Sequence, residues 1–209
     1  MTAMAGSSGA EQHATMEAPN TATITLGILA GGRASRLGGL DKAWLQRGGI
    51  AQVLRWQRRF AAETTTTLVS ANRAQGNYAQ HGLTAVADRV TGAGPLSGLD
   101  ALAHACTTPW LLTVPVDLVG VNECLLPSLR AAAGDHGACA VDDDGPQPLV
   151  ALWPAAALRA AACQALASGD HAVHGLQARL DMHAVRFAGV RFGNLNTMAD
   201  LQAAGVCAP

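Results

Sequence analysis

The chain has 209 residues, of which 49% are hydrophobic, and its formal net charge is −1 at pH 7. This length suits one compact domain with a sizeable core, and so large an apolar content excludes wholesale disorder. The near-neutral charge, without a basic stripe, argues against a surface for duplex nucleic acid or for an anionic membrane. No apolar stretch approaches the roughly 20 residues that span a bilayer. We therefore expect a small-molecule partner.

Strand-like and helix-like segments alternate along the chain. Residues 24–30 form an apolar run that ends at a glycine pair, as is typical of a central parallel strand. Further strands are expected at 64–71, 84–87, 109–116, 138–142, 147–153 and 183–187. Helical periodicity is found at 50–60, 96–106, 125–133, 155–167 and 172–180, and residues 197–200 resemble a capping box that opens a last short helix.

This alternation predicts the α/β class, with a mainly parallel, Rossmann-like three-layer α/β/α sheet. The turn Asp143-Asp144-Gly145 predicts a hairpin, so one strand should be antiparallel. We expect Asp142 to Asp144 to be a solvated hairpin tip rather than a metal cluster. Ligands bind at the carboxyl ends of strands in such sheets. The loop at Gly31, together with Asp88 and Asp117, follows predicted strands and should therefore converge there.

Residues 1–22 have no lysine, arginine or continuous apolar run, which argues against a secretory signal. We expect a flexible extension over 1–22 and one folded domain over 23–209. The five scattered cysteines contain no C-x-x-C pair, unlike a disulfide framework or a zinc site. Reduced thiols and a cytoplasmic protein are expected. Apolar packing is expected for the four cysteines other than Cys207, which lies near the end of the chain.

The segment Leu29 to Lys42 has the character of a phosphate-binding loop. It has four glycines in nine positions and three cations, Arg33, Arg36 and Lys42. Glycine lets backbone N–H groups approach an anion closely, and the cations complete a cradle for phosphates. Lys42 is the only lysine in the chain, which suggests a need for a compact ammonium. P-loop and dinucleotide motifs are absent, and a flexible loop with incidental cations is the alternative.

Asp117 lies where an apolar strand ends, and we predict that it is a ligand of Mg²⁺. A magnesium–triphosphate site needs only one or two carboxylates, because phosphates and water supply the other ligands. A loop or helix-capping carboxylate is the alternative. Asp88 with Arg89 is, taken alone, more simply a surface ion pair. Neither a histidine metal motif nor a G-x-S-x-G elbow is present, so covalent catalysis is unsupported.

Several segments together resemble the molybdenum cofactor guanylyltransferases, within the broader Rossmann-like nucleotidyltransferases. They occur in the family's order and cover almost everything after Thr23. The pieces GPLSGL and NLNT favour the molybdopterin branch over transferases of sugar phosphates. The matching segments are LAGGRASRLGGLDK at 29–42, SANR at 70–73, VADR at 86–89, GAGPLSGL at 92–99, PVDL at 115–118, QPLVALW at 147–153 and FGNLNTMADL at 192–201.

The resemblance implies Mg²⁺-dependent transfer of GMP from GTP to the molybdenum–molybdopterin cofactor, which gives the guanine dinucleotide cofactor and pyrophosphate. Asp117 would bind both the metal and GTP, and Lys42 the phosphates. The other residues that the resemblance assigns to GTP are Leu29, Ala30, Gly31, Ser70 and Asp88. Ser70 stands where the family often has Asn, so its hydrogen bond reaches less far. The segment Leu118-Val119-Gly120 replaces the family's usual turn containing Thr and Pro.

The chemistry of such a transfer requires no strong general base, because the terminal phosphate of the pterin is already nucleophilic at neutral pH. Catalysis would be positioning and charge stabilisation by Lys42, Arg36 and the Mg²⁺ that Asp117 holds. Asn194 and Asn196 are candidates for contacts with the pterin cofactor, with turn formation as the alternative. A molybdoenzyme or a maturation chaperone is a candidate partner. A transferase that uses CTP or a sugar phosphate, and a non-catalytic nucleotide-binding adaptor, are the rival functions.

Overall fold

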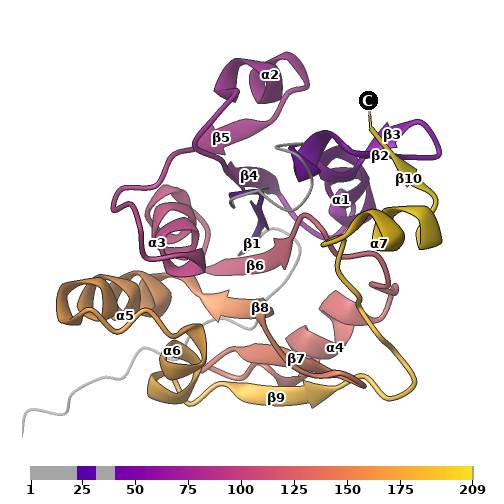
Figure 1. Cartoon of the computed structure of the whole chain (residues 1–209). Coiled ribbons are helices and arrows are strands. Elements are labelled where there is room, and N and C mark those ends of the chain that lie inside the picture. Colours follow the sequence, from indigo (N-terminus) through magenta and orange to yellow (C-terminus); the bar gives the residue numbers. More distant parts are fainter. Residues whose placement is uncertain (1–22, 32–40, 209) are drawn as a thin grey trace, which may run out of the picture.

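A computed structural model describes residues 23–31 and 41–208, which include a seven-stranded sheet of order β5-β4-β1-β6-β8-β7-β9 (Figure 1). Its strands are β1 Ile24–Leu29, β4 Thr66–Ser70, β5 Thr84–Val86, β6 Trp110–Pro115, β7 Ala138–Asp142, β8 Gly145–Pro154 and β9 His183–Arg186. The helices are α1 Gln52–Phe60, α2 Gln75–Gln80, α3 Pro95–Ala105, α4 Leu125–Ala132, α5 Ala155–Ser168, α6 Val173–Arg179 and α7 Met198–Ala203.

Strand directions in this sheet confirm the predicted mainly parallel architecture. Strands β5, β4, β1 and β6 pair in parallel, as do β7 and β9. Strand β8 alone runs against its neighbours β6 and β7 in this sheet. The predicted hairpin between β7 and β8 is therefore confirmed, and β6 and β7 point toward the same edge of the sheet.

Helices cover both faces of the sheet, which gives the predicted three layers. On one face, the cluster that contains Ile24, Leu26 and Ile28 of β1 packs against α1 and α4. On the other face, the cluster that contains Leu111 and Trp153 packs against α3, α5 and α6. Burying a large apolar side chain stabilises the fold by about 1.5–3 kcal/mol, so strands buried on both faces make a strong framework.

A second, smaller sheet of order β10-β2-β3 was missed by the sequence analysis. It consists of β2 Gln46–Arg47, β3 Ile50–Ala51 and β10 Val206–Cys207. Beside it, the side chains of Leu45, Leu195, Leu201 and Val206 form a separate cluster that includes α7. Ile50, expected to open a helix, lies in β3, and the helix begins at Gln52. Helix α2 was also missed.

The environment of several polar residues differs from expectation. Asp142 is 0% exposed rather than solvated at a hairpin tip. Two cysteines expected to be packed, Cys124 and Cys163, are exposed, although all five cysteines are free as predicted. The extension expected over 1–22 lies outside the described residues. No helix in the described part of the chain has the length and apolar character needed to cross a bilayer.

Candidate active site

Four parallel strands end together at one edge of the sheet. Backbone hydrogen bonds continue past the strands: Ala30 N donates to Ser70 O at 3.1 Å, and Val116 N donates to Leu29 O at 3.0 Å. Ala71 N likewise donates to Val86 O at 2.9 Å. The loops that follow β1, β4, β5 and β6 therefore start side by side, and the predicted convergence of these strand ends is confirmed.

The centre of this edge is a cluster of Lys42, Asp117 and Asn196. Lys42 Nζ donates to Asp117 Oδ2 at 2.7 Å and to Asn196 Oδ1 at 2.8 Å. The side chains of Lys42 and Asp117 are 21% and 19% exposed, so solvent and ligands reach both. Asp41 accepts a hydrogen bond from Ala43 N and so caps the short helix Lys42–Trp44, which orients the lysine. The predicted phosphate-binding cation and the predicted metal ligand are thus direct neighbours.

Asp117 is held in place by a segment from much later in the chain. Its carbonyl oxygen accepts a hydrogen bond from Leu195 N at 2.9 Å, and Phe192 O accepts from Val119 N and Gly120 N at 3.0 and 2.8 Å. A Cβ atom at Gly120 would lie 2.1 Å from Arg191 O, so this close approach requires glycine. The segment Leu118-Val119-Gly120 is therefore paired closely with the segment around Phe192.

Asn196 is positioned by the start of α7. The predicted capping box is confirmed: Asp200 N donates to Thr197 Oγ1 at 3.2 Å, and Thr197 N donates to Asp200 Oδ2 at 2.7 Å. Asn196 N donates to the same carboxylate oxygen at 3.0 Å. These hydrogen bonds, from Thr197 first and Asn196 next, lower the pKa of Asp200, which keeps the carboxylate ionised. The backbone of Asn196 is thus fixed with its amide oxygen at Lys42.

A second polar contact joins the loops after β4 and β5. Asn72 Nδ2 donates to Asp88 Oδ2 at 2.7 Å, and Asp88 N donates to Asn72 Oδ1 at 2.8 Å. The ion pair considered between Asp88 and Arg89 is not formed here, because Arg89 lies 3.2 Å from Asp100 instead. The sequence analysis assigned no role to Asn72. Its position in SANR, directly after a strand end, could have indicated that it lies at the site.

The other residues predicted to bind GTP or to act in catalysis differ in how exposed they are. Leu29 is buried, Ala30 half-buried and Gly31 exposed at the end of β1. Ser70 is 1% exposed and lies beneath α3, since a Cβ atom at Gly98 would come within 2.6 Å of Ser70 Oγ. Arg36, predicted to be catalytic, falls within 32–40 and lies outside the described residues.

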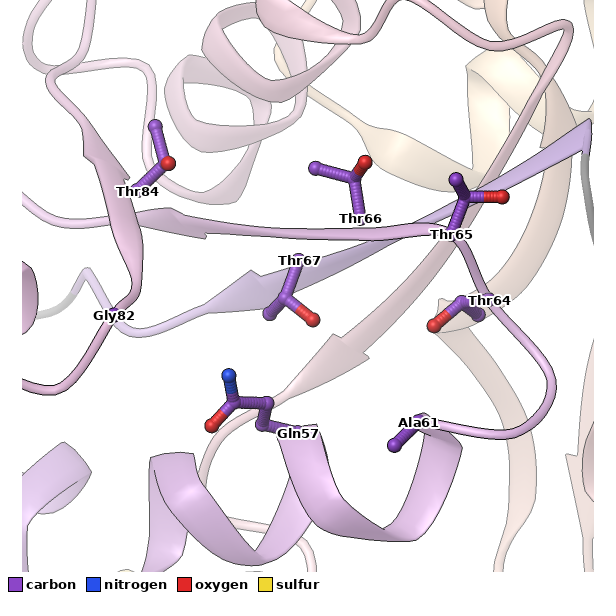
Figure 2. A pocket seen from close by; sticks show the side chains of 8 residues that line it. All are labelled: Gln57, Ala61, Thr64, Thr65, Thr66, Thr67, Gly82 and Thr84. Carbon is purple, nitrogen blue, oxygen red and sulfur yellow. The ribbon is translucent and has the colours of Figure 1, made fainter.

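A pocket on the opposite edge of the sheet is separate from this site. Its lining includes four consecutive threonines, Thr64 to Thr67, together with Thr84 and Gln57, and Figure 2 shows Thr65 and Thr66 pointing to one side of the chain and Thr64 and Thr67 to the other. Thr66 and Thr84 begin β4 and β5, whereas Ser70 and Asp88 lie toward the other ends of these strands. No lining residue is charged, so this pocket lacks the cations needed to bind a triphosphate.

A known domain family matches most of the chain. The MobA-like NTP transferase domain corresponds to residues 26–184, which run from β1 into β9 and include Lys42, Asp88 and Asp117. The chain belongs to the MobA-like NTP transferase family. It is therefore a nucleotidyltransferase, as the loop and the strand-end carboxylates had indicated. Asn196 lies beyond the matched residues, yet it completes the cluster at Lys42.

Curated relatives of this MobA-like chain include two proteins named molybdenum cofactor guanylyltransferase. The protein of Yersinia pseudotuberculosis serotype O:1b (strain IP 31758) is 33% identical over 181 residues, which cover 85% of this chain and 92% of the relative. The protein of Cupriavidus metallidurans is 33% identical over 188 residues, with the same coverage.

Solved structures support the nucleotidyltransferase fold. The molybdopterin-guanine dinucleotide biosynthesis protein A of Archaeoglobus fulgidus superposes with a TM-score of 0.66 at 18% identity, over 87% of this chain and 96% of that one. The 2-C-methyl-D-erythritol 4-phosphate cytidylyltransferase of Thermus thermophilus gives 0.62 at 18% identity, over 86% and 96%. Because transferases with different named substrates share the fold, the fold alone does not identify the substrate.

Proposed function

We propose that this MobA-like protein is a molybdenum cofactor guanylyltransferase. It transfers GMP from GTP to the molybdenum–molybdopterin cofactor and releases pyrophosphate. The observation that carries this proposal is the contact of Lys42 with Asp117 and Asn196 at the carboxyl edge of the parallel strands. The names of relatives that are 33% identical over 85% of the chain support the choice of substrates.

The cluster offers the ligand types that magnesium prefers. Asp117 Oδ2 and Asn196 Oδ1 both lie within 2.8 Å of one ammonium nitrogen, so two oxygen ligands already converge on a positive charge. Mg²⁺ takes one or two carboxylates and completes its shell with phosphates and water. Bound there, Mg²⁺ would neutralise charge that develops on the triphosphate oxygens. The residues present therefore fit this ion, with Asp117 as its ligand.

Lys42 acts by exchanging partners. Its side chain is partly exposed and unbranched, so its ammonium can turn from Asp117 to the phosphates of an entering triphosphate. The exchange frees the carboxylate and places positive charge where the α-phosphate is attacked. A phosphate oxygen of the pterin cofactor forms the new bond to the α-phosphorus, and the bond to pyrophosphate breaks. Lys42 and Arg36 stabilise the charge of this transition state, with Arg36 assigned from sequence alone.

The guanosine would lie over the ends of β1 and β5. We assign Leu29, Ala30 and Gly31 to one side of it and Asp88 to the other, with Asn72 orienting the Asp88 carboxylate. Ser70 supports this surface from beneath α3, because its side chain is buried.

Pyrophosphate release provides the test of this function. With saturating molybdenum–molybdopterin cofactor and Mg²⁺, we expect turnover with GTP and at least about tenfold less with CTP or ATP, the discrimination available from one or two lost hydrogen bonds. Faster turnover with CTP would identify a cytidylyltransferase. GTP binding without any product would identify a nucleotide-binding adaptor and contradict the proposal.

Two further assignments accompany this function. We propose that residues 23–209 form the catalytic domain, so a chain lacking 1–22 should release pyrophosphate at the parent rate. We also propose a cytoplasmic location, since all five cysteines are free and GTP is a cytoplasmic substrate. Cell fractionation that found the protein only in an extracytoplasmic fraction would contradict the second assignment.

A further inference from the structure

A cluster of three metal-binding residue types lies between α3 and α5. Asp100 and His104 come from α3 and Cys163 from α5, and one ligand atom of each lies within 4.8 Å of the other two. Asp100 is 0% exposed, His104 is half-buried and Cys163 is exposed. The cluster therefore has a buried carboxylate at its base and a thiol at its entrance.

The separations within the cluster suit tetrahedral coordination. Cys163 Sγ lies 3.8 Å from Asp100 Oδ1 and 3.8 Å from His104 Nε2, and the imidazole approaches Asp100 Oδ1 to 3.2 Å through Nδ1. Zinc bonds of about 2.0–2.3 Å at tetrahedral angles place neighbouring ligand atoms about 3.3–3.8 Å apart. One ion could therefore contact all three side chains with only small movements, which leaves a fourth position for water.

The imidazole is oriented as metal-binding histidines usually are. His104 Nδ1 lies 2.9 Å from the backbone oxygen of Asp100. In the tautomer with its proton on Nδ1, the imidazole donates to this carbonyl oxygen. This tautomer leaves the lone pair on Nε2, which lies 3.8 Å from Cys163 Sγ. Such an outer hydrogen bond fixes the tautomer and raises the basicity of the coordinating nitrogen.

A cation of the protein already occupies this place. Arg89 Nη1 lies 3.2 Å from Asp100 Oδ2, 3.3 Å from Asp100 Oδ1, and 2.8 and 2.7 Å from Nδ1 and Nε2 of His104. The guanidinium thus marks the point where the carboxylate and the imidazole attract positive charge. The side chain of Arg89 is 50% exposed, so it can turn into solvent at little cost.

We propose that Asp100, His104 and Cys163 form a binding site for a divalent transition metal, Zn²⁺ in particular, which Arg89 closes in the absence of the ion. A set of one sulfur, one nitrogen and one oxygen ligand suits zinc and not magnesium, which prefers oxygen alone. Binding expels Arg89 from the cluster and releases the proton of the Cys163 thiol to solvent. The site is distinct from the oxygen ligands at Asp117.

The test uses the full chain after dialysis against a chelator. Titration calorimetry should show one equivalent of Zn²⁺ bound, and Co²⁺ should give thiolate-to-cobalt charge-transfer absorption. Cys163→Ser should abolish this absorption and raise the Kd for Zn²⁺ by about tenfold or more. Cys124→Ser, which alters another exposed cysteine outside the cluster, is the matched control and should bind as the parent does.

A second variant separates this site from ordinary surface binding of zinc. Arg89→Ala removes the competing cation and should lower the Kd for Zn²⁺, whereas loss of a merely structural contact would not tighten binding. His104→Ala should weaken binding as Cys163→Ser does. Circular dichroism spectra confirm that each variant is folded. Absence of the cobalt–thiolate absorption in the parent, or equal Kd values for the parent and Cys163→Ser, would overturn the proposal.

Discussion

Asp117 and Asp142 lie at the carboxyl ends of two strands that point the same way, yet their surroundings are opposite. Asp117 is partly exposed, and its carboxylate pairs with the ammonium of Lys42, which is also partly exposed. Asp142 is fully buried, and its two oxygens accept from Asp144 N at 2.9 Å, Gln147 Nε2 at 3.1 Å and Phe192 N at 2.8 Å.

The difference shows that a carboxylate at a strand end is not functional by position alone. A side-chain cation can leave when a ligand enters, whereas backbone N–H groups stay where the fold puts them. Burial alone would raise the pKa of Asp142, but the hydrogen bonds from Phe192, Gln147 and Asp144 lower it below its usual value. We therefore interpret Asp142 as a structural anchor and Asp117 as a group that exchanges partners.

The largest expected effect separates these two roles directly. Asp117→Asn should lower the rate of Mg²⁺-dependent pyrophosphate release by about 10²–10³-fold, because loss of one well-placed charge commonly costs this much. The midpoint of urea unfolding should barely change, because a partly exposed ion pair contributes about 1 kcal/mol or less. Parent-like turnover in this variant would exclude Asp117 as the metal ligand.

Substitutions of Lys42 test the other member of this ion pair. Lys42→Ala should lower turnover by about 10²-fold, since it removes a charge next to the reacting phosphates. Lys42→Arg keeps the charge and should restore only part of the rate, because a planar guanidinium does not replace a compact ammonium. Steady-state rates with GTP measure both effects. Full activity in Lys42→Arg would show that charge, and not shape, is what the site requires.

Asp142→Asn should lower stability but leave the activity of the folded protein unchanged, the reverse of what we expect for Asp117→Asn. The amide nitrogen of Asn would face backbone donors, at a cost of about 1–3 kcal/mol in the free energy of unfolding. Asp144→Asn is the matched control, because Asp144 is half-exposed in the same hairpin and should change stability little. Urea denaturation of both variants measures the difference. Equal stabilities would mean that the buried hydrogen bonds of Asp142 are replaceable.

The smallest expected effect is a change with pH in the free energy of unfolding under acidic conditions. Because the pKa of Asp142 is lower in the folded chain, its contribution is fully present above the unfolded carboxyl pKa of about 3.9. The contribution is lost as pH falls through the lower folded value. The stability difference between the parent and Asp142→Asn should therefore shrink below about pH 4. Urea unfolding of both proteins between neutral pH and about pH 3 measures this difference. A difference that stays constant over this range would contradict the prediction.

Much of the fold could be predicted because its signals are local. The strand at 138–142 was predicted with its observed bounds, and the apolar run at 24–30 matches β1 to within one residue. The two-residue strands β2, β3 and β10 are too short to show any periodicity, so their small sheet was missed. Pairing between residues that are far apart in sequence, and not local pattern, forms that sheet.

The site was only partly predictable, because its contacts also join residues that are far apart in the sequence. Lys42 and Asp117 were each identified from their own segments, but their contact spans 75 residues and no local pattern indicates it. Asn196 was named only as a candidate, because turn formation explained it equally well. The burial of Asp142 depends on Phe192, 50 residues later, and so the sequence favoured a solvated tip.

The contact between Lys42 and Asn196 closes a loop across 154 residues. A ribosome makes Lys42 and Asp117 long before it makes Asn196, and the segment at 192–196 also holds the loop of Asp117. During synthesis, the parallel strands can therefore assemble before the cluster at their edge is complete. Because residues 192–196 are made after all seven strands of the large sheet, the site is completed only after its framework. A nascent chain that lacks its final segment would carry the framework of the enzyme without the finished cluster.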